Sequence, residues 1–432
     1  MQAIVEQVFD FWRVFGNFWY LWLPIALFFL FRESWKGYLR GYFLSNKKWI
    51  LLEIRVPRDV AKSPKAMESI FAGLHSAGKS IDLVDRYWKG YENPWFSLEV
   101  IGNASGVHFF IWTEAGLRRL VESQIYAQYP ASEITEVPDY ARDLPPDVPN
   151  NDWTLWGAEM VLTKPDAYPI RTYEDFTLED ISEKEELRKI DPLSSMVEFL
   201  GSLEAGEQCW IQFIVRPAGE GWKKEGEALM AKIIGREVKK EENFFQQVLR
   251  WVSDFVGSLG ALLATGAPTA SPPDKKDDFS IFKLSPGQQE TIKAVERNIT
   301  KIGFEVGLRW MYIARRDKFN PVGISALFGI FKQFTSQSLN GFKPYRKTSS
   351  MIGYWQYVPK FKAIKEHTKK RRIYRAYRMR GFFFPPFNKV RPFVLSSSEL
   401  ATVYHFPGIV AGAPAMARIE AKKGSAPPNL PL

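Results

Sequence analysis

The chain has 432 residues and a formal net charge of +10, from 58 Lys and Arg against 48 Asp and Glu. Its length leaves room for two or three domains, and a hydrophobic content of 46% supplies ample core, which excludes a wholly disordered chain. A single cysteine, Cys209, excludes an internal disulfide framework and suits a reducing compartment.

The first predicted element is a transmembrane helix, because Val14–Phe31 contains eighteen residues without a charge. A buried core helix and a cleaved signal peptide are the alternatives, but the acidic start and the missing small-residue cleavage site disfavour the signal peptide. Residues 1–47 would form the anchor and a basic juxtamembrane segment. The residues predicted at the membrane interface are Trp19, Trp22, Trp35, Arg32, Lys36 and Arg40.

Charge around this run predicts its orientation. Basic residues follow the run, from Arg32 to Lys48, with Glu33 as the one acidic residue among them. Because basic flanks stay on the cytoplasmic side, we expect a single-pass inner-membrane protein with its N-terminus outside and its bulk in the cytoplasm. The same basic flank favours contact with an anionic lipid bilayer.

A first α+β unit is predicted over 48–140. Apolar runs, helix caps and a glycine-rich hairpin give the order strand, helix, strand, strand, helix, strand. This is the order of a split βαβ, or ferredoxin-like, unit. The elements are strands at Trp49–Val56, Trp95–Ile101, Val107–Trp112 and Ser132–Val137, and helices at 63–76 and 113–129.

A proline-rich linker at 141–152 leads to a second α+β unit over 153–340, also expected to be ferredoxin-like. An insertion at 219–282 interrupts this unit. Within it, Phe244–Leu263 has one apolar helical face that could contact lipid, a partner or its own domain, and a disordered linker follows at 266–280. The predicted fold class is therefore α+β, with an N-terminal transmembrane helix and two ferredoxin-like units.

A literal P-loop pattern, G-x-x-x-x-G-K-S, spans Gly73–Ser80. A working P-loop needs a strand before the glycines and a helix after the lysine, so that backbone N–H groups and the lysine hold phosphates. Here the predicted helix precedes Gly78, which favours an ordinary helix end. Nucleotide hydrolysis through Lys79 remains the least favoured of the alternatives.

The basic segment at 341–392 carries fifteen Lys and Arg between Lys343 and Arg391, against Glu366 alone. Clustered cations bind phosphates, and interleaved tyrosines could stack on bases. Nucleic acid, anionic lipid and a protein interface all remain open. The candidate phosphate-binding residues are Lys369, Lys370, Arg371, Arg372, Arg375, Arg378 and Arg380.

Catalytic and metal motifs find no support in the sequence. The four histidines, His75, His108, His367 and His405, do not pair with Cys, Asp or Glu at metal-ligand spacing. No G-x-S-x-G elbow is present. We therefore expect a protein that is not an enzyme and needs no cofactor or metal.

One segment carries a family resemblance. Leu395–Pro407, LSSSELATVYHFP, resembles the LS-x-x-ELA-x-x-x-H-x-P segment of large ATPases of type IV secretion and conjugative DNA transfer. In those proteins the segment precedes a HerA/FtsK-type motor domain. The anchor, the strand at Trp49–Val56 and the blocks at 94–100 and 108–112 are similar in layout.

The resemblance implies a role without catalysis. The family continues into its motor where this sequence ends, so we expect the motor on a separate chain. The expected function is an anchored subunit of a type IV secretion or conjugation-like apparatus that docks a HerA/FtsK-like ATPase through 393–432, with DNA as a possible further partner and oligomerisation within a larger assembly. The alternative is a membrane-tethered nucleic-acid-binding protein. The docking candidates are Leu395, Glu399, Leu400, His405 and Pro407.

Overall fold

The structure, a computed structural model, describes residues 16–17, 19–57, 62–176, 191–219, 221–234, 285–351 and 359–407. The predicted helix at 244–263, the linker at 266–280 and the tail after 407 lie outside these described residues.

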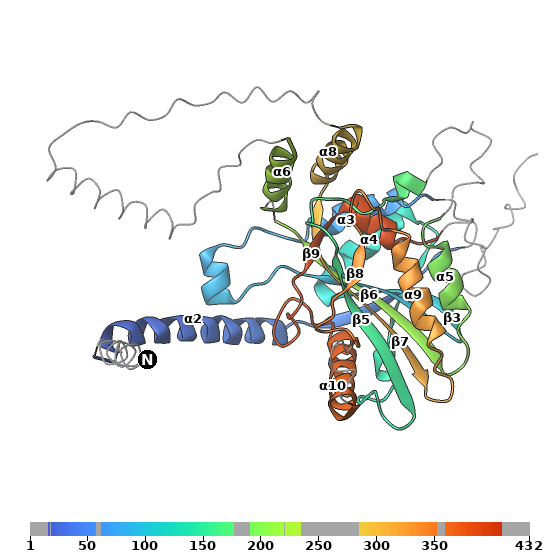
Figure 1. The fold of residues 1–432 in the computed structure, drawn as a ribbon, viewed down its shortest axis with the longest axis horizontal. Coiled ribbons are helices and arrows are strands. Elements are labelled where there is room, and N and C mark those ends of the chain that lie inside the picture. Colours follow the sequence, from blue (N-terminus) through green and yellow to red (C-terminus); the bar gives the residue numbers. More distant parts are fainter. Residues whose placement is uncertain are drawn as a thin grey trace, which may run out of the picture.

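The described strands form one antiparallel sheet of nine strands. Figure 1 shows the sheet at the centre of the molecule, with helices around it. The strands are β1 (Trp49–Arg55), β2 (Phe96–Asn103), β3 (Gly106–Glu114), β4 (Glu133–Val137), β5 (Trp153–Leu162), β6 (Glu207–Pro217), β7 (Gly303–Arg315), β8 (Phe342–Pro344) and β9 (Phe393–Ser396).

The strand order is β4-β1-β3-β2-β6-β7-β5-β8, and β9 also pairs with β7. The junction between the two halves is the pairing of β2 with β6, which runs from Phe96 opposite Val215 to Gly102 opposite Cys209. The prediction of two separate ferredoxin-like units behind a transmembrane helix is therefore wrong. Strand pairing across the expected domain boundary merges the two halves into one sheet.

Helices cover both faces of this sheet. One face carries the larger core cluster, to which α3, α4, α5, α9 and α11 contribute. The other face carries a second cluster with Ile373, Tyr374 and Tyr377 of α10. The helices are α2 (Trp19–Ser45), α3 (Lys65–His75), α4 (Arg118–Gln128), α5 (Ser194–Gly201), α6 (Gly221–Ile234), α8 (Pro286–Ile299), α9 (Val322–Lys332), α10 (Pro359–Arg378) and α11 (Ser397–Val403). Short helical turns are η1 (Asp85–Lys89), η2 (Ala115–Leu117), η3 (Tyr140–Arg142) and η4 (Tyr173–Phe176).

Strand β7 is the longest described strand, and it shows why a core cluster forms on each face of the sheet. Side chains alternate across a strand, so Leu308 and Trp310 enter the larger cluster while Met311 and Ile313 enter the second. Along one edge of β7, β9 pairs with Gly303–Val306 and β5 pairs with Leu308–Arg315. Two strands therefore share that edge.

Helix α2 extends away from the sheet (Figure 1). Its apolar part, Trp19–Phe31, is followed within the same helix by Arg32 and Glu33. Among the described residues, no helix has both the length and the apolar character needed to cross a membrane. This finding corrects the predicted span at Val14–Phe31, and with it the predicted N-out, single-pass localisation in the inner membrane.

Candidate functional site

The residues predicted at a membrane interface lie along α2, and several of them contact the protein itself. Arg40 Nε lies 2.6 Å from Glu92 Oε1, and Trp35 Nε1 donates to the carbonyl of Tyr87 at 2.9 Å. Lys36 and Arg32 both reach Glu33, while Trp19 is exposed. Trp22 also belongs to α2. The C-terminal half of α2 is thus tied to the body near η1.

The seven candidate cations of the basic segment lie in the last turns of α10 and just after this helix. Four of its seven candidate cations have partners within the protein. Lys369 donates to the carbonyls of Arg346 and Met351, Lys370 pairs with Glu366, Arg372 pairs with Glu159, and Arg380 pairs with Glu99 and Asp139. Burial lowers the pKa of Lys369. The predicted cluster is therefore mostly part of the fold.

Three arginines remain without a carboxylate partner among the described residues: Arg371, Arg375 and Arg378. Arg371 and Arg375 are exposed, and Arg378 is half-buried with its guanidinium over the ring of Tyr374 at 5.6 Å. Arg371 and Arg375 are four positions apart, and Arg375 and Arg378 are three apart. Residues at these spacings share one helical face, so the three arginines form one stripe along α10. The stripe is about 10 Å long at the helical rise of ~1.5 Å per residue.

Tyr374 and Tyr377, the tyrosines interleaved with these cations, cannot stack on bases. Tyr374 is 1% exposed and Tyr377 is fully buried. Both rings pack against Trp210, with centroids 6.1 and 5.1 Å away. They hold α10 on the sheet, which corrects the predicted role of these aromatics.

A buried ion network fixes the end of α10. Arg380 donates to both oxygens of Glu99 at 3.0 and 3.2 Å and to both oxygens of Asp139 at 2.7 and 2.8 Å. Burial alone would lower the pKa of Arg380, but Glu99 and Asp139 raise it well above its ordinary value. Burial would raise the pKa of Asp139, and Arg380 holds it below its ordinary value. The network keeps its charges and anchors the chain after α10.

A groove of about 570 Å³ opens beside this network. Its walls come from the end of α2, from β1, β3, β4 and the residue before β2, from η3 and the residue before it, and from the end of α10 and the two residues after it. Its distinctive lining residues are Trp49, Trp95, Trp112, Arg142, Arg378 and Met379. The volume lies in the range of ~300–1,000 Å³ that is common for ligand sites.

Three tryptophans form an aromatic cluster along the groove, in which Trp49 and Trp112 are stacked and Trp95 is tilted to both. The Trp49 and Trp112 rings are parallel with centroids 4.0 Å apart, and Trp95 lies 4.7 Å from Trp49. The guanidinium of Arg380 lies 5.5 Å from the Trp112 ring. The wall is thus aromatic and held in place by packing on both sides.

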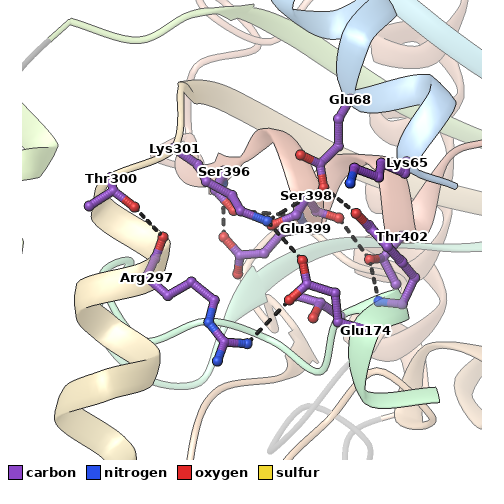
Figure 2. A network of polar contacts seen from close by, with 12 residues as sticks. Lys65, Glu68, Glu174, Arg297, Thr300, Lys301, Ser396, Ser398, Glu399 and Thr402 are labelled. Atoms are coloured by element: carbon purple, nitrogen blue, oxygen red, sulfur yellow. Dashed lines mark hydrogen bonds and ion pairs between the residues drawn. The ribbon is translucent and has the colours of Figure 1, made fainter. Parts of the chain in front are cut away.

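The segment that resembles the ATPase family, Leu395–Pro407, includes the end of β9, which pairs with β7, and all of α11. Ser396 and Glu399 form a reciprocal cap at the start of α11, and Glu399 Oε1 also accepts from the Ile170 N–H at 2.8 Å. Burial raises the pKa of Glu399 to about 7 against the opposing effect of these hydrogen bonds. Figure 2 shows Glu399 among Ser396, Ser398 and Thr402.

The other docking candidates are also buried. Leu395 and Leu400 belong to the larger core, and His405 Nε2 lies 3.0 Å from Asp191 Oδ1 while its Nδ1 contacts the Ala401 carbonyl. Pro407 is buried. A partner therefore cannot contact these five side chains directly in this structure.

Charged side chains lie over this segment instead. Lys301 approaches Glu174 at 3.1 Å and Glu68 at 3.5 Å, and Arg297 lies 3.2 Å from Glu174 (Figure 2). A cavity of about 50 Å³ beneath them is lined by Ser398, Asn298 and Ile170, among others. It is large enough for water but not for a substrate.

The P-loop pattern has a structural role here. Helix α3 ends before Gly78, and Lys79 Nζ lies 2.7 Å from Asp85 and 4.1 Å from the Tyr91 ring centroid. The lysine is thus engaged with its own chain, and the strand–loop–helix order of a phosphate loop is not found over these residues.

Within the described part of the chain, no group of three or more His, Cys, Asp or Glu could hold a metal. Cys209 is buried at the β2–β6 junction, where burial raises the pKa of its thiol. Its role is packing.

Sequence reasoning found Arg378 and Arg380 but missed the aromatic side of the groove. Trp112 faces Leu51 and Ser97 only because β3 pairs with both β1 and β2. Trp49 and Trp95 lie far from it in sequence. The predicted hairpin places Trp95 and Trp112 at the same end of two paired strands, but the sequence does not show that β1 brings Trp49 beside them.

Comparisons with known proteins add a family but no activity. No curated protein matches the chain at a significant level. The sequence model of one family matches residues 43–410, which is most of the chain and includes the whole sheet. The chain therefore belongs to the family described as Domain of unknown function (DUF8128).

Proposed function

We propose that this protein is a non-catalytic docking subunit of a DNA-transfer apparatus and works with a HerA/FtsK-like motor ATPase on another chain. The observation that supports it most is the position of Leu395–Pro407. This segment resembles the one that precedes the motor in conjugative ATPases. Here it forms the end of β9, which pairs with β7, and α11, which packs in the larger core cluster.

The geometry refines how docking would work. Because Glu399, Leu400 and His405 are buried, they fix the segment and leave the contact itself to its surroundings. Among the described residues, the charged side chains of Arg297 and Lys301 lie over the segment and are the proposed contact, and the residues after Pro407 are the second proposed contact.

A co-purification experiment tests this proposal. Deletion from 395 onward would remove β9, so the sharper variant is truncation after residue 410, which keeps the whole family region. We expect this truncation, or the pair Arg297→Glu and Lys301→Glu, to lose at least 90% of the co-purified HerA/FtsK-like ATPase from the same organism. Lys332→Glu on α9, an exposed cation, is the control. Full retention by both test variants, or no co-purification with the intact chain, rejects the proposal.

A second candidate function is nucleic-acid binding by the stripe of Arg371, Arg375 and Arg378. The observation that favours it is that these three cations have no carboxylate partner in the part of the chain that the structure describes, while their neighbours Lys370, Arg372 and Arg380 do. Cations left free on one face suit phosphates.

Salt dependence tests the second candidate. Affinity for DNA should fall steeply between 50 and 200 mM salt, and the pair Arg371→Glu and Arg375→Glu should abolish it, because each phosphate contact releases counterions. Lys332→Glu should leave it unchanged. DNA affinity that is equal in the pair variant and the intact chain rejects this candidate.

A further inference from the structure

The groove beside the end of α10 has chemistry that the stripe alone lacks. It combines an aromatic wall of Trp49, Trp95 and Trp112 with two guanidinium groups, Arg142 and Arg378. Neither arginine forms an ion pair with a described carboxylate. The acidic lining residues pair elsewhere, Asp139 with Arg380 and Glu136 with Arg118. The groove therefore presents two guanidinium groups beside aromatic rings.

A second observation concerns an exposed apolar side chain. Met379 is left 63% exposed at the same groove. Burial of apolar surface is favourable, so Met379 gains a contact when a flat molecule fills the groove.

We infer that the groove of Trp49, Trp95, Trp112, Arg142, Arg378 and Met379 binds a short segment of single-stranded nucleic acid. A nucleobase has flat apolar faces for Met379 and the tryptophan wall. The phosphates on either side of it match Arg142 and Arg378. Aromatic walls with arginines are the usual means of holding single strands without strong sequence preference.

Two competing occupants fit less well. An acidic peptide would pair with the arginines through its carboxylates, but acidic side chains offer no flat apolar surface to pack against the three tryptophans. A duplex keeps its bases paired inside the helix, so its bases cannot reach the groove, and it would contact the arginines through phosphates alone.

The inference deepens the second candidate function and rests on it. Arg378 belongs to both the stripe and the groove, so the stripe of Arg371 and Arg375 would continue the path of the backbone away from the groove. Stripe and groove are separable by substitution, because Arg142 and Met379 line the groove and lie outside the stripe.

The experiment uses the full chain and fluorescence anisotropy with labelled dT12, a hairpin duplex with the same number of phosphates, and a twelve-residue polyglutamate. We expect dT12 to bind at least tenfold more tightly than the duplex. Met379→Glu and Arg142→Glu should each weaken dT12 binding about tenfold or more, and each should weaken dT12 binding more than duplex binding. Both changes are at exposed side chains. Lys332→Glu on α9, at the opposite face of the sheet, should change neither affinity.

The outcomes separate the two ideas. Loss of dT12 binding in the Arg371→Glu and Arg375→Glu pair, but not in either groove variant, overturns the groove and keeps the second candidate. Duplex or polyglutamate binding as tight as dT12 also overturns the groove as a single-strand site. No binding of any probe overturns both ideas. Photocrosslinking of an oligonucleotide that contains 5-iododeoxyuridine, followed by peptide mapping, should mark Trp49, Trp112 or Met379; marks elsewhere count against the groove.

Discussion

A buried guanidinium holds the end of α10 against the sheet. Arg380 bonds two carboxylates, and Glu99 in turn accepts from Ser97 and Gln212 and from the Tyr140 hydroxyl. Ion pairs of this kind add little over an apolar pair, but removing one partner leaves an uncompensated charge. The groove depends on this network, because Arg380 and Asp139 form part of its wall.

Arg380→Met tests the network at the residue scale. We expect the free energy of unfolding to fall by about 3–5 kcal/mol, because Glu99 and Asp139 lose their counter-charge. Urea denaturation measures the change. Adding Glu99→Gln to Arg380→Met should recover part of the loss, and Arg391→Met, at a side chain that is 83% exposed, should cost less than about 0.5 kcal/mol. Equal costs for Arg380→Met and Arg391→Met would contradict the network.

Glu399 gives a pH dependence. Its pKa of about 7 in the folded chain lies above the unfolded value of ~4.3, so the folded state binds more protons between these values. Stability contributed by this group is thus fully present below pH ~4.3 and is lost as pH rises to 7, by roughly 3 kcal/mol in total. Glu399→Gln should flatten this fall between pH 5 and 8 in urea denaturation. A variant that loses as much stability over that range as the original chain would show that other groups are responsible.

Sequence reasoning at this scale located the cations but not their partners. The run Lys369–Arg380 predicted a charged surface, and the structure leaves three of its seven cations without carboxylate partners. Glu159, which pairs with Arg372, and Glu99, which pairs with Arg380, lie in strands far away in sequence. Which cations are free therefore depends on tertiary pairing.

At the scale of elements, the chain after α10 packs on β7 through a glycine. A Cβ at Gly307 would lie 2.4 Å from Phe382 Cγ, so only glycine lets the ring reach the strand. Phe382 also lies under the buried guanidinium of Arg309, whose Cζ is 5.3 Å from the ring centroid. The contact fixes the segment that carries Arg380.

Gly307→Ala should lower the free energy of unfolding by about 1–3 kcal/mol, because the aromatic ring must shift in a packed core. The matched control is Gly287→Ala in α8, where a Cβ meets nothing within 4 Å. The control should be neutral or stabilising by up to about 1 kcal/mol. Urea denaturation of the two variants compares them, and an unchanged Gly307→Ala would refute the close packing.

Local signals predicted several elements well. The strand predicted at Trp49–Val56 and the hairpin strands predicted at Trp95–Ile101 and Val107–Trp112 correspond to β1, β2 and β3. These signals work because an alternation or a turn depends on neighbours in sequence. The apolar run before Arg32 predicted a transmembrane helix, but α2 continues past this run through the charged residues Arg32 and Glu33.

At the scale of the molecule, β2 and β6 join the two halves through seven facing residue pairs. The two halves also share a core cluster that includes Phe96 and Phe213. Such an interface resembles the interior of one domain more than a contact between two. The sequence held one hint, because β6 has apolar residues on both faces, Ile211 and Phe213 on one and Trp210 and Ile214 on the other, whereas an edge strand usually carries protective charges.

One cooperative transition should follow from this junction. Unfolding in urea, followed by tryptophan fluorescence and by far-ultraviolet circular dichroism, should give coincident curves with one midpoint, because neither half can lose β2 or β6 without exposing the other. Two separated midpoints would show that the halves fold independently.

The sharing of one β7 edge by β5 and β9 has a consequence for biosynthesis. Strand β5 is translated long before β7, but residues 393–396, which cover the remaining part of that edge, emerge from the ribosome last among the described strands. A nascent chain must therefore keep four positions on this edge of β7 unpaired until residues 393–396 have emerged. Chaperone binding during translation is expected to concentrate on that interval and to end when α11 is released.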